Sequence, residues 1–196
     1  MRVLVACEYS GVVRDAFTRA GHDAYSCDLL PSETPGNHIE GDVLECLGGD
    51  WDLMIAHPPC TYLANSGVRW LYEDPDRWAW LDEATAFFNA LLDAPIDSIC
   101  VENPIPHKYA VERLDGRRYT QLIQPWQFGH METKATCLWL KGLPKLVPTS
   151  DLKEETMALP ESQRGRIFYA SPSADRWKER SKTYEGIAAA MAAQWT

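Results

Sequence analysis

Short apolar segments rich in β-branched residues alternate, along this chain of 196 residues, with segments of helical periodicity. The strand-like segments span residues 2–6, 23–27, 39–43, 52–56 and 98–101. The helix-like segments span residues 12–21, 78–92 and 184–195. This alternation predicts an α/β fold, a mostly parallel sheet with helices on both faces. Two later extended segments, residues 122–126 and 135–140, predict a C-terminal antiparallel hairpin.

The composition is that of a single globular domain. Hydrophobic residues make up 45% of the chain and charged residues 24%, which excludes a disordered chain. The net charge of −9 argues against a protein that coats nucleic acid non-specifically. No apolar run is long enough to span a membrane, and the start, MRVLVACEYSG, lacks a secretory signal. We therefore expect a cytoplasmic protein that does not enter a membrane.

Six cysteines are spread along the chain at positions 7, 27, 46, 60, 100 and 137. They form no CxxC pair, and His107 and His130 lack the spacing of zinc ligands. We expect free thiols and no metal site. Most of these cysteines lie in or beside apolar strand-like segments, where a thiol usually packs as a small core residue. Cys60 does not, because it follows two prolines.

Chemistry-bearing residues follow the predicted strands, and the carboxyl ends of parallel strands meet at one edge of a sheet. Here they are residues 7–11, Asp28, Asp42, residues 57–60 and residues 102–104. An acidic residue after the second strand is typical of a site for ribose hydroxyls. The chain lacks a full GxGxxG, which a dinucleotide pyrophosphate would favour. The pattern therefore predicts a cofactor with a ribose but no phosphate.

The order of these motifs resembles the DNA cytosine-5 methyltransferase family over residues 1–140. The carrying segments are ACEYSGVVRDAF, CDLLP, GDV, DLMIAHPPCTYLANSG and VENP. The resemblance implies a Rossmann-like methyltransferase fold and the cofactor S-adenosylmethionine. It also implies that the cofactor is bound by Glu8, Tyr9, Ser10, Gly11, Asp28, Leu29, Asp42, Val43 and Pro58.

The resemblance further implies a covalent mechanism. Carbon 5 of cytosine is a poor nucleophile, so a thiolate, here Cys60, adds to carbon 6 and makes carbon 5 able to attack a methyl group. Glu102 would then act at nitrogen 3 as a carboxylic acid with a raised pKa. A further catalytic motif of the family carries two arginines, and at that place in this chain only Lys134 is positively charged. The substrate would also touch Pro59, Thr61 and Asn103.

The chain departs from the family pattern at several positions. Thr61 and Pro104 replace the usual Gln and hydrophobic residue, and Glu132, Lys134 and Thr136 stand where a Gln and two arginines would. Only about 35 residues fill the place of a target-recognition region, too few for an independent core. We divide the chain into a catalytic domain (1–140), a short insertion (141–182) and a closing helix (183–196). Target recognition would then come from the insertion, a partner or a second protomer.

A basic segment lies inside this insertion. Between Arg164 and Lys182 there are six basic and two acidic residues, Asp175 and Glu179, for a local charge of +4. We interpret its cations as substrate-binding, namely Arg164, Arg166, Arg176, Lys178 and Arg180. A solvated charged face is the alternative. Chemistry on a base in duplex DNA requires flipping it out, and Tyr62 or Trp70 would stack on it if they do not simply pack.

The sequence therefore predicts methyl transfer from S-adenosylmethionine to carbon 5 of cytosine in DNA, most simply a duplex with a flipped cytosine. Two alternatives stay open: the same chemistry on a free cytosine nucleotide or single-stranded nucleic acid, and a silent cofactor- or DNA-binding module. A hydrolase pairing Cys60 with His57 is disfavoured, because the two lie three residues apart in a proline-stiffened turn.

Overall fold

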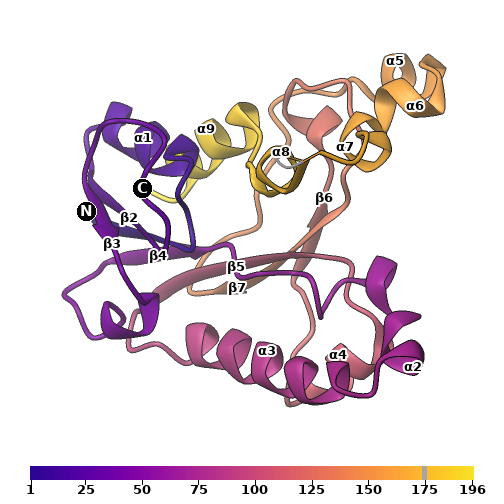
Figure 1. Cartoon of the computed structure of the whole chain (residues 1–196). Coiled ribbons are helices and arrows are strands. Elements are labelled where there is room, and N and C mark those ends of the chain that lie inside the picture. The colour runs from indigo at the N-terminus through magenta and orange to yellow at the C-terminus, as the bar shows by residue number, and fades with distance from the viewer. Residues whose placement is uncertain (174–175) are drawn as a thin grey trace.

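One mixed sheet runs through the computed structural model, which describes residues 1–173 and 176–196. In these residues the sheet has seven strands in the order β3-β2-β1-β4-β5-β7-β6 (Figure 1). Strands β1 to β5 pair in parallel, and β7 runs antiparallel to β5 and β6. The strands are β1 Arg2–Ala6, β2 Asp23–Asp28, β3 His38–Glu40, β4 Leu53–Ala56, β5 Ser98–Pro104, β6 Gln121–Ile123 and β7 Thr136–Lys141. The predicted α/β fold and C-terminal hairpin are confirmed.

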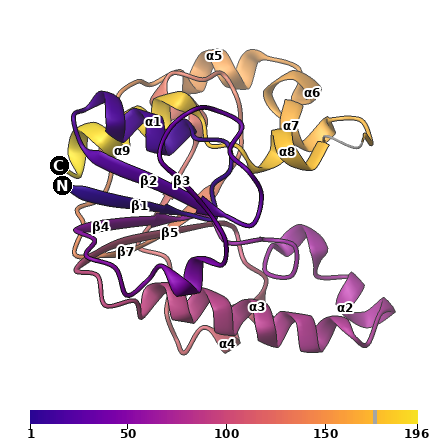
Figure 2. The ribbon, with the colours of Figure 1, turned by 60° about the vertical axis from the view of Figure 1, so that its left-hand side comes forward.

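Helices cover both faces of the sheet (Figure 2). Helices α1 (Val12–Arg19) and α9 (Glu185–Gln194) lie on one face, and α3 (Arg77–Leu92) and α4 (Lys108–Arg113) lie on the other. Alternate residues of each strand point to opposite faces, so both cores draw on the same strands. Val3 and Val5 of β1 pack with α1 and α9, whereas Leu4 and Ala6 pack on the α3 side.

The remaining helices are short. Helix α2 (Trp70–Glu73) follows the loop that contains Cys60, and 3₁₀ turns lie at Val43–Glu45, Asn65–Gly67 and Pro125–Phe128. The predicted insertion, residues 141–182, contains α5 Lys153–Ala158, α6 Glu161–Arg164, α7 Arg166–Tyr169 and α8 Arg176–Ser181. Ala174 and Asp175 lie outside the described residues. Helices of four to six residues have no long hydrophobic period, so the sequence did not predict them.

Three strands end three residues away from the ends expected from the sequence. Strand β5 runs on to Pro104, because β7 pairs with Glu102, Asn103 and Pro104. Strand β3 ends at Glu40, so Asp42 lies after the strand rather than in it. Strand β6 ends at Ile123, because Pro125 begins a 3₁₀ turn. No helix in the described part of the chain is both long and apolar enough to cross a membrane.

Arg14 is a buried cation that ties α1 to the loop after β2. Its guanidinium is 1% exposed and pairs with Asp15 at 2.8 Å. It also donates hydrogen bonds to the hydroxyls of Ser26, Ser32 and Thr34 and to the carbonyl of Pro35. Gly36 approaches so closely that an added Cβ would lie 2.7 Å from the guanidinium carbon. Arg14 therefore sets the path of the loop that follows Asp28.

We expect Arg14→Met to lower the free energy of unfolding by about 2–4 kcal/mol, because it strands several buried hydrogen-bonding groups. Denaturant unfolding would show a lower midpoint at an unchanged slope. Arg19→Met, in the exposed last turn of the same helix, is the matched control and should change the free energy by less than about 0.5 kcal/mol. Equal midpoints for the two variants would contradict this role of Arg14.

Candidate active site

The site lies at the carboxyl edge of the parallel strands. Ala6 of β1 pairs with Ala56 of β4, which in turn pairs with Val101 of β5. The next residues, Cys7, His57 and Glu102, therefore reach this edge together. Lys134 arrives at the same edge from the other direction, because β7 starts at Thr136 and runs antiparallel. The edge predicted from the strand ends is thus formed.

The loop after β1 builds the first wall. The Glu8 carboxylate is buried and accepts hydrogen bonds from the Val13 amide at 2.7 Å and the Arg14 amide at 3.1 Å. It therefore caps the N-terminus of α1, where a negative charge is stabilised by the helix dipole. Gly11 has a φ of 76°, a conformation that favours glycine. Ser10 is buried and donates to Glu8 at 3.3 Å.

Two acidic residues stand at the far side of this edge. Asp28 accepts the Leu30 amide at one carboxylate oxygen, and Asp42 accepts the Leu44 amide in the same way. In the described structure, the second carboxylate oxygen of each residue accepts no hydrogen bond from the protein. Apolar side chains follow both acids: Leu29 is 74% exposed, and Val43 is buried. These residues together offer two acceptors beside an apolar surface.

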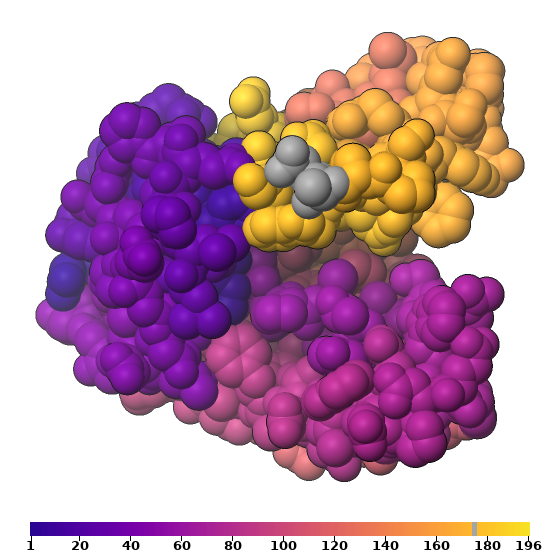
Figure 3. All heavy atoms as spheres, viewed as in Figure 1, coloured from indigo at the N-terminus to yellow at the C-terminus, as the bar shows by residue number. Residues whose placement is uncertain are grey.

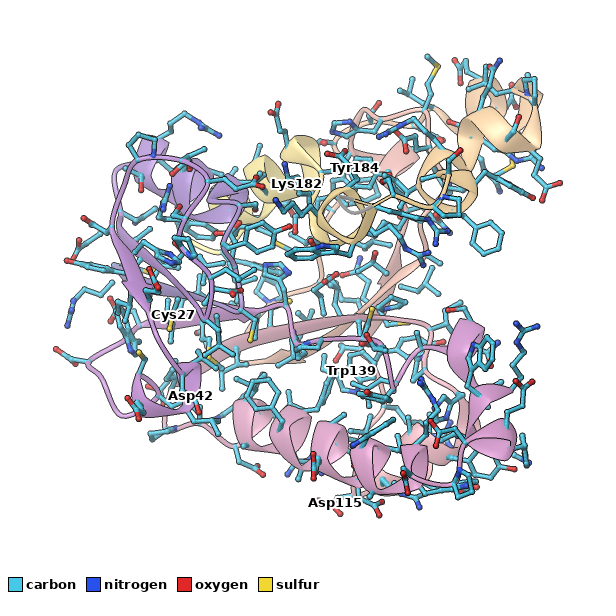
Figure 4. The ribbon with its side chains drawn as sticks, viewed as in Figure 1. Cys27, Asp42, Asp115, Trp139, Lys182 and Tyr184 are labelled. Carbon is cyan, nitrogen blue, oxygen red and sulfur yellow. The ribbon has the colours of Figure 1, made fainter. Side chains whose placement is uncertain are left out.

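The thiols of Cys7 and Cys27 lie close to both acids. Burial, together with the charges of Asp28 and Asp42, raises the pKa of each thiol to about 12. Cys27 Sγ also lies 3.6 Å from Cys46 Sγ. All six cysteines are free thiols, as expected from the sequence. Figure 4 shows Cys27 and Asp42 on the β1–β3 side of the molecule.

Cys60 begins the turn after β4. Pro58 before it is buried, whereas Pro59 and Thr61 beside it are exposed. Its carbonyl accepts the amides of Leu63 and Ala64, so the turn is held by the backbone. Burial and the charge of Glu102 raise the pKa of the Cys60 thiol, and the charges of Lys134 and Arg180 act against this rise. The thiol is therefore near one anionic and two cationic groups.

Glu102 makes its closest charged contact with His57. Its Oε1 lies 3.3 Å from Nδ1 of His57. Burial raises the pKa of Glu102, but contact with His57 and the charges of His57 and Lys134 outweigh it, so the pKa is lowered from its ordinary value. We expected a raised pKa for this acid, and that expectation is wrong. The sequence did not show that an imidazole shares its pocket.

Lys134 links this edge of the sheet to the C-terminal segment. Its Nζ donates hydrogen bonds to the carbonyls of Arg180 at 2.9 Å and Lys182 at 3.2 Å. Tyr9 reaches the same segment, with its hydroxyl 3.0 Å from Ser181 Oγ and its ring 5.5 Å from that of Trp177. Lys182 pairs with Glu33 at 2.8 Å. Figure 4 shows Lys182 and Tyr184 where α8 leads into α9.

The five cations expected to bind substrate differ in their partners. Arg164 donates to the carbonyls of Met157 and Leu159, and Arg166 pairs with Glu132 at 3.1 Å. Arg176 donates to the carbonyl of Phe168, and Lys178 lies 5.8 Å from the Trp177 ring. Arg180 is the one among them whose charge acts on Cys60. Of the other three residues expected to touch substrate, Pro59 and Thr61 lie on the loop after β4 and are exposed. Asn103 lies in the antiparallel end of β5 and is 1% exposed.

The surface is hollowed between α7–α8 and α2 (Figure 3). The loop that contains Cys60 leads into α2, and Arg180, whose charge acts on the Cys60 thiol, belongs to α8. Trp70 is 42% exposed and lies beneath the Arg69 guanidinium. Tyr62 packs against Trp80 and Arg77 instead, which favours a packing role for it.

The sequence interpretation missed the roles of two residues of this region, Arg14 and His57. Arg14 carried a signal, because it falls within the buried stripe of α1 beside Val13, Ala16 and Phe17. His57 was weighed only as a partner for Cys60, and its contact with Glu102 depends on strand pairing that the sequence does not display. In the described residues, no group of histidine, cysteine or acidic side chains is arranged to hold a metal ion.

Three of the solved structures that resemble this chain are described as methyltransferases. A protein described as a DNA modification methyltransferase of an E. coli prophage has a TM-score of 0.46 at 15% identity, over 82% of this chain and 56% of its own. Entamoeba histolytica methyltransferase EhMeth has a TM-score of 0.48 at 13% identity, over 77% and 57%. S. pombe Dnmt2 methyltransferase has a TM-score of 0.46 at 16% identity, over 74% of this chain and 51% of its own.

The chain thus spans little more than half of each of these proteins. Each score is below 0.5, so the likeness assigns no function to this chain. No protein-family model matches the sequence, and no curated protein sequence is significantly similar to it.

The charges around Cys60 predict its reactivity toward iodoacetamide. Glu102→Gln should speed alkylation of Cys60 at pH 7.5, since it removes a charge that raises the thiol pKa. Arg180→Met should slow alkylation, with about a tenfold change for each pKa unit. Peptide mass spectrometry would give the rates. Lys145→Met, an exposed cation, is the matched control and should leave the rate unchanged. Shifts of the same sign in the first two variants would refute this electrostatic account.

Proposed function

We propose that this chain transfers a methyl group from S-adenosylmethionine to carbon 5 of cytosine in DNA, through a covalent adduct between Cys60 and carbon 6. One observation carries the proposal: Cys60 and Glu102 come from neighbouring strand ends and lie close enough for the charge of Glu102 to act on the thiol. A nucleophile and a proton-handling group on the two sides of one base are what the reaction requires.

The residues at the β1–β3 side suit the cofactor. Asp28 has a carboxylate oxygen to accept the ribose hydroxyls, and Asp42 has one to accept from the adenine side. Leu29 would supply exposed apolar surface for the purine, and Val43 follows Asp42 but is buried. The segment Glu8 to Gly11 with Pro58 would border the amino acid end. The bound cofactor would supply an electrophilic methyl group. Two carboxylates that accept hydrogen bonds beside an exposed leucine fit a neutral adenosine better than a phosphate, because like charges repel.

The chain's own side chains would handle the base. The Cys60 thiolate adds to carbon 6, and the electron pair of the 5,6 double bond moves toward nitrogen 3, where a proton is needed. Lys134 and Arg180 favour the thiolate. After methylation, water takes the carbon 5 proton, the electron pair of that C–H bond re-forms the 5,6 double bond, and Cys60 leaves carbon 6 as a thiolate. Asn103, Pro59 and Thr61 would line the base.

The DNA would enter through the hollow between α8 and α2. Arg180, whose charge acts on Cys60, lies on α8 with Arg176 and Lys178, so positive charge is local in a chain of net charge −9. The insertion supplies few other recognition elements, so we propose that a second protomer or a partner contributes to target recognition.

The first test is methyl transfer itself. Incubation with S-adenosylmethionine labelled with tritium in its methyl group should label cytosine-containing duplex DNA. Cys60→Ser should lower the rate on the order of 1,000-fold, because it removes the nucleophile. Cys46→Ser, a half-buried thiol on another loop, is the matched control and should retain the wild-type rate. Duplex DNA containing 5-fluorocytosine should form a denaturation-resistant complex with wild type and not with Cys60→Ser.

The substrates separate the alternatives. If dCMP or single-stranded DNA is labelled and duplex DNA is not, the labelled molecule would be the substrate instead of duplex DNA. Cofactor binding without transfer to any cytosine substrate would instead support the silent module. Absence of the 5-fluorocytosine complex under turnover conditions would refute Cys60 as the nucleophile.

A second prediction concerns the cofactor. Asp28→Asn should weaken S-adenosylmethionine binding about tenfold, because a charge-assisted hydrogen bond to the ribose is lost. Isothermal titration calorimetry gives the affinity, and the smaller cofactor-induced rise in Tm provides a second measurement. Asp50→Asn is the matched control, since only the backbone carbonyl of Asp50 bonds to Arg2. Equal affinities in both variants would place the ribose elsewhere.

A further inference from the structure

His57 is a buried imidazole inside the candidate active site. Its side chain is 8% exposed, and in the described structure neither ring nitrogen makes a hydrogen bond of good geometry or reaches solvent. Its amide donates to the carbonyl of Ala6, and Pro58 follows it, so the backbone at His57 is held in place. Its nearest charged atom is Oε1 of Glu102, 3.3 Å from Nδ1. A cavity of about 10 Å³, the space of about one water molecule, borders both side chains.

The groups that face His57 favour its charged form. Two carboxylates act on it, Glu102 from β5 and Glu8 from the loop after β1, and one cation, Lys134, opposes them. Tyr184, which also borders the cavity, donates its hydroxyl to Glu132 and adds no charge. Burial lowers the pKa of His57, but the carboxylates outweigh it and raise the pKa above its ordinary value. The pair therefore holds a proton on the imidazole and a negative charge on Glu102.

This arrangement conflicts with a simple acid role for Glu102. An ionised carboxylate has no proton to give, yet the adduct at carbon 6 needs one at nitrogen 3. The neighbouring cation is not an evident source, because Lys134 already donates to the carbonyls of Arg180 and Lys182. The group that carries a proton within reach of Glu102 is the imidazolium of His57.

We infer that His57 is a positioning residue that stores the proton which Glu102 passes to nitrogen 3 of the target cytosine; this rests on the proposed function. As Cys60 Sγ bonds to carbon 6, the displaced π-electron pair gives nitrogen 3 the basicity to take a proton through Glu102. The Nδ1–H bond of His57 breaks, its electron pair stays on the ring, and the imidazole becomes neutral. When Cys60 leaves carbon 6, the proton returns from nitrogen 3 through Glu102 to Nδ1. No net proton is consumed by this relay, and no further reactant is required.

The pH dependence of methyl transfer tests this role. In His57→Gln, Glu102 must hold the proton by itself, and it loses that proton at a lower pH than the wild-type imidazolium does. The ratio of wild-type to variant rate should therefore rise with pH, from less than about threefold at pH 5.5 to at least about tenfold at pH 8. His22→Gln, remote from the site, is the matched control and should keep the ratio near one at every pH.

A loss of rate in His57→Gln that is the same at every pH would overturn the inference, because a packing role would not titrate. Unchanged rates would overturn it as well. The inference is supported if the ratio rises with pH and the melting curve shows that the variant is folded.

A second measurement does not depend on activity or on a folded His57 variant. Nitrogen-15 shifts of the imidazole should report a charged His57 in the wild type at pH 6.5, and a neutral one in Glu102→Gln at the same pH, because burial then prevails. A neutral His57 in the wild type at pH 6.5 would overturn the inference. If His57 is charged but no methyl transfer is found, the proposed function would be refuted, while the storage of a proton on His57 would still hold.

Discussion

The register of the three central strands determines where every group of the site lies. Ala6, Ala56 and Val101 lie side by side in β1, β4 and β5, and the chain leaves the parallel register just after them. A slip of one residue in β5 would turn Glu102 to the α3 face, because side chains alternate. The buried residues of β4 and the valines and isoleucine of β1 and β5 resist such a slip, since it would expose their apolar side chains or bury polar ones. The geometry of the candidate site thus depends on packing of the core.

The parts of the fold that the sequence predicts are those with an uninterrupted local pattern. Strand β1 and helices α1, α3 and α9 each carry their own period, and the five strand ends follow from parallel pairing. The end of β5 could not be read in the same way, because Glu102 to Pro104 become a strand only through their partner β7. The short helices α5 to α8 are held by contacts such as Arg164 to the carbonyls of Met157 and Leu159. Such contacts link residues that no periodicity relates.

The site shows the same division. Cys60 and Glu102 could be chosen from their positions after the strands, whereas the proton state of Glu102 could not. That state depends on His57, which lies 45 positions earlier in the chain but 3.3 Å away in space. Arg14 is similar: a charge in an apolar helix stripe is visible, but the loop carbonyls and hydroxyls that satisfy it are not. Electrostatics therefore follow tertiary contacts rather than local sequence.

The C-terminal segment joins the two halves of the site. Ser181 and Trp177 contact Tyr9 beside the proposed cofactor site, Lys182 pairs with Glu33 of the loop after Asp28, and the carbonyls of Arg180 and Lys182 bind Lys134. Residues 177–182 of the basic segment are therefore docked on residues of both proposed sites. A cofactor that ordered the loop after Asp28 would stabilise this docking, and with it the position of Arg180 near Cys60. Under the proposed function, the same few residues would serve both cofactor and nucleic acid.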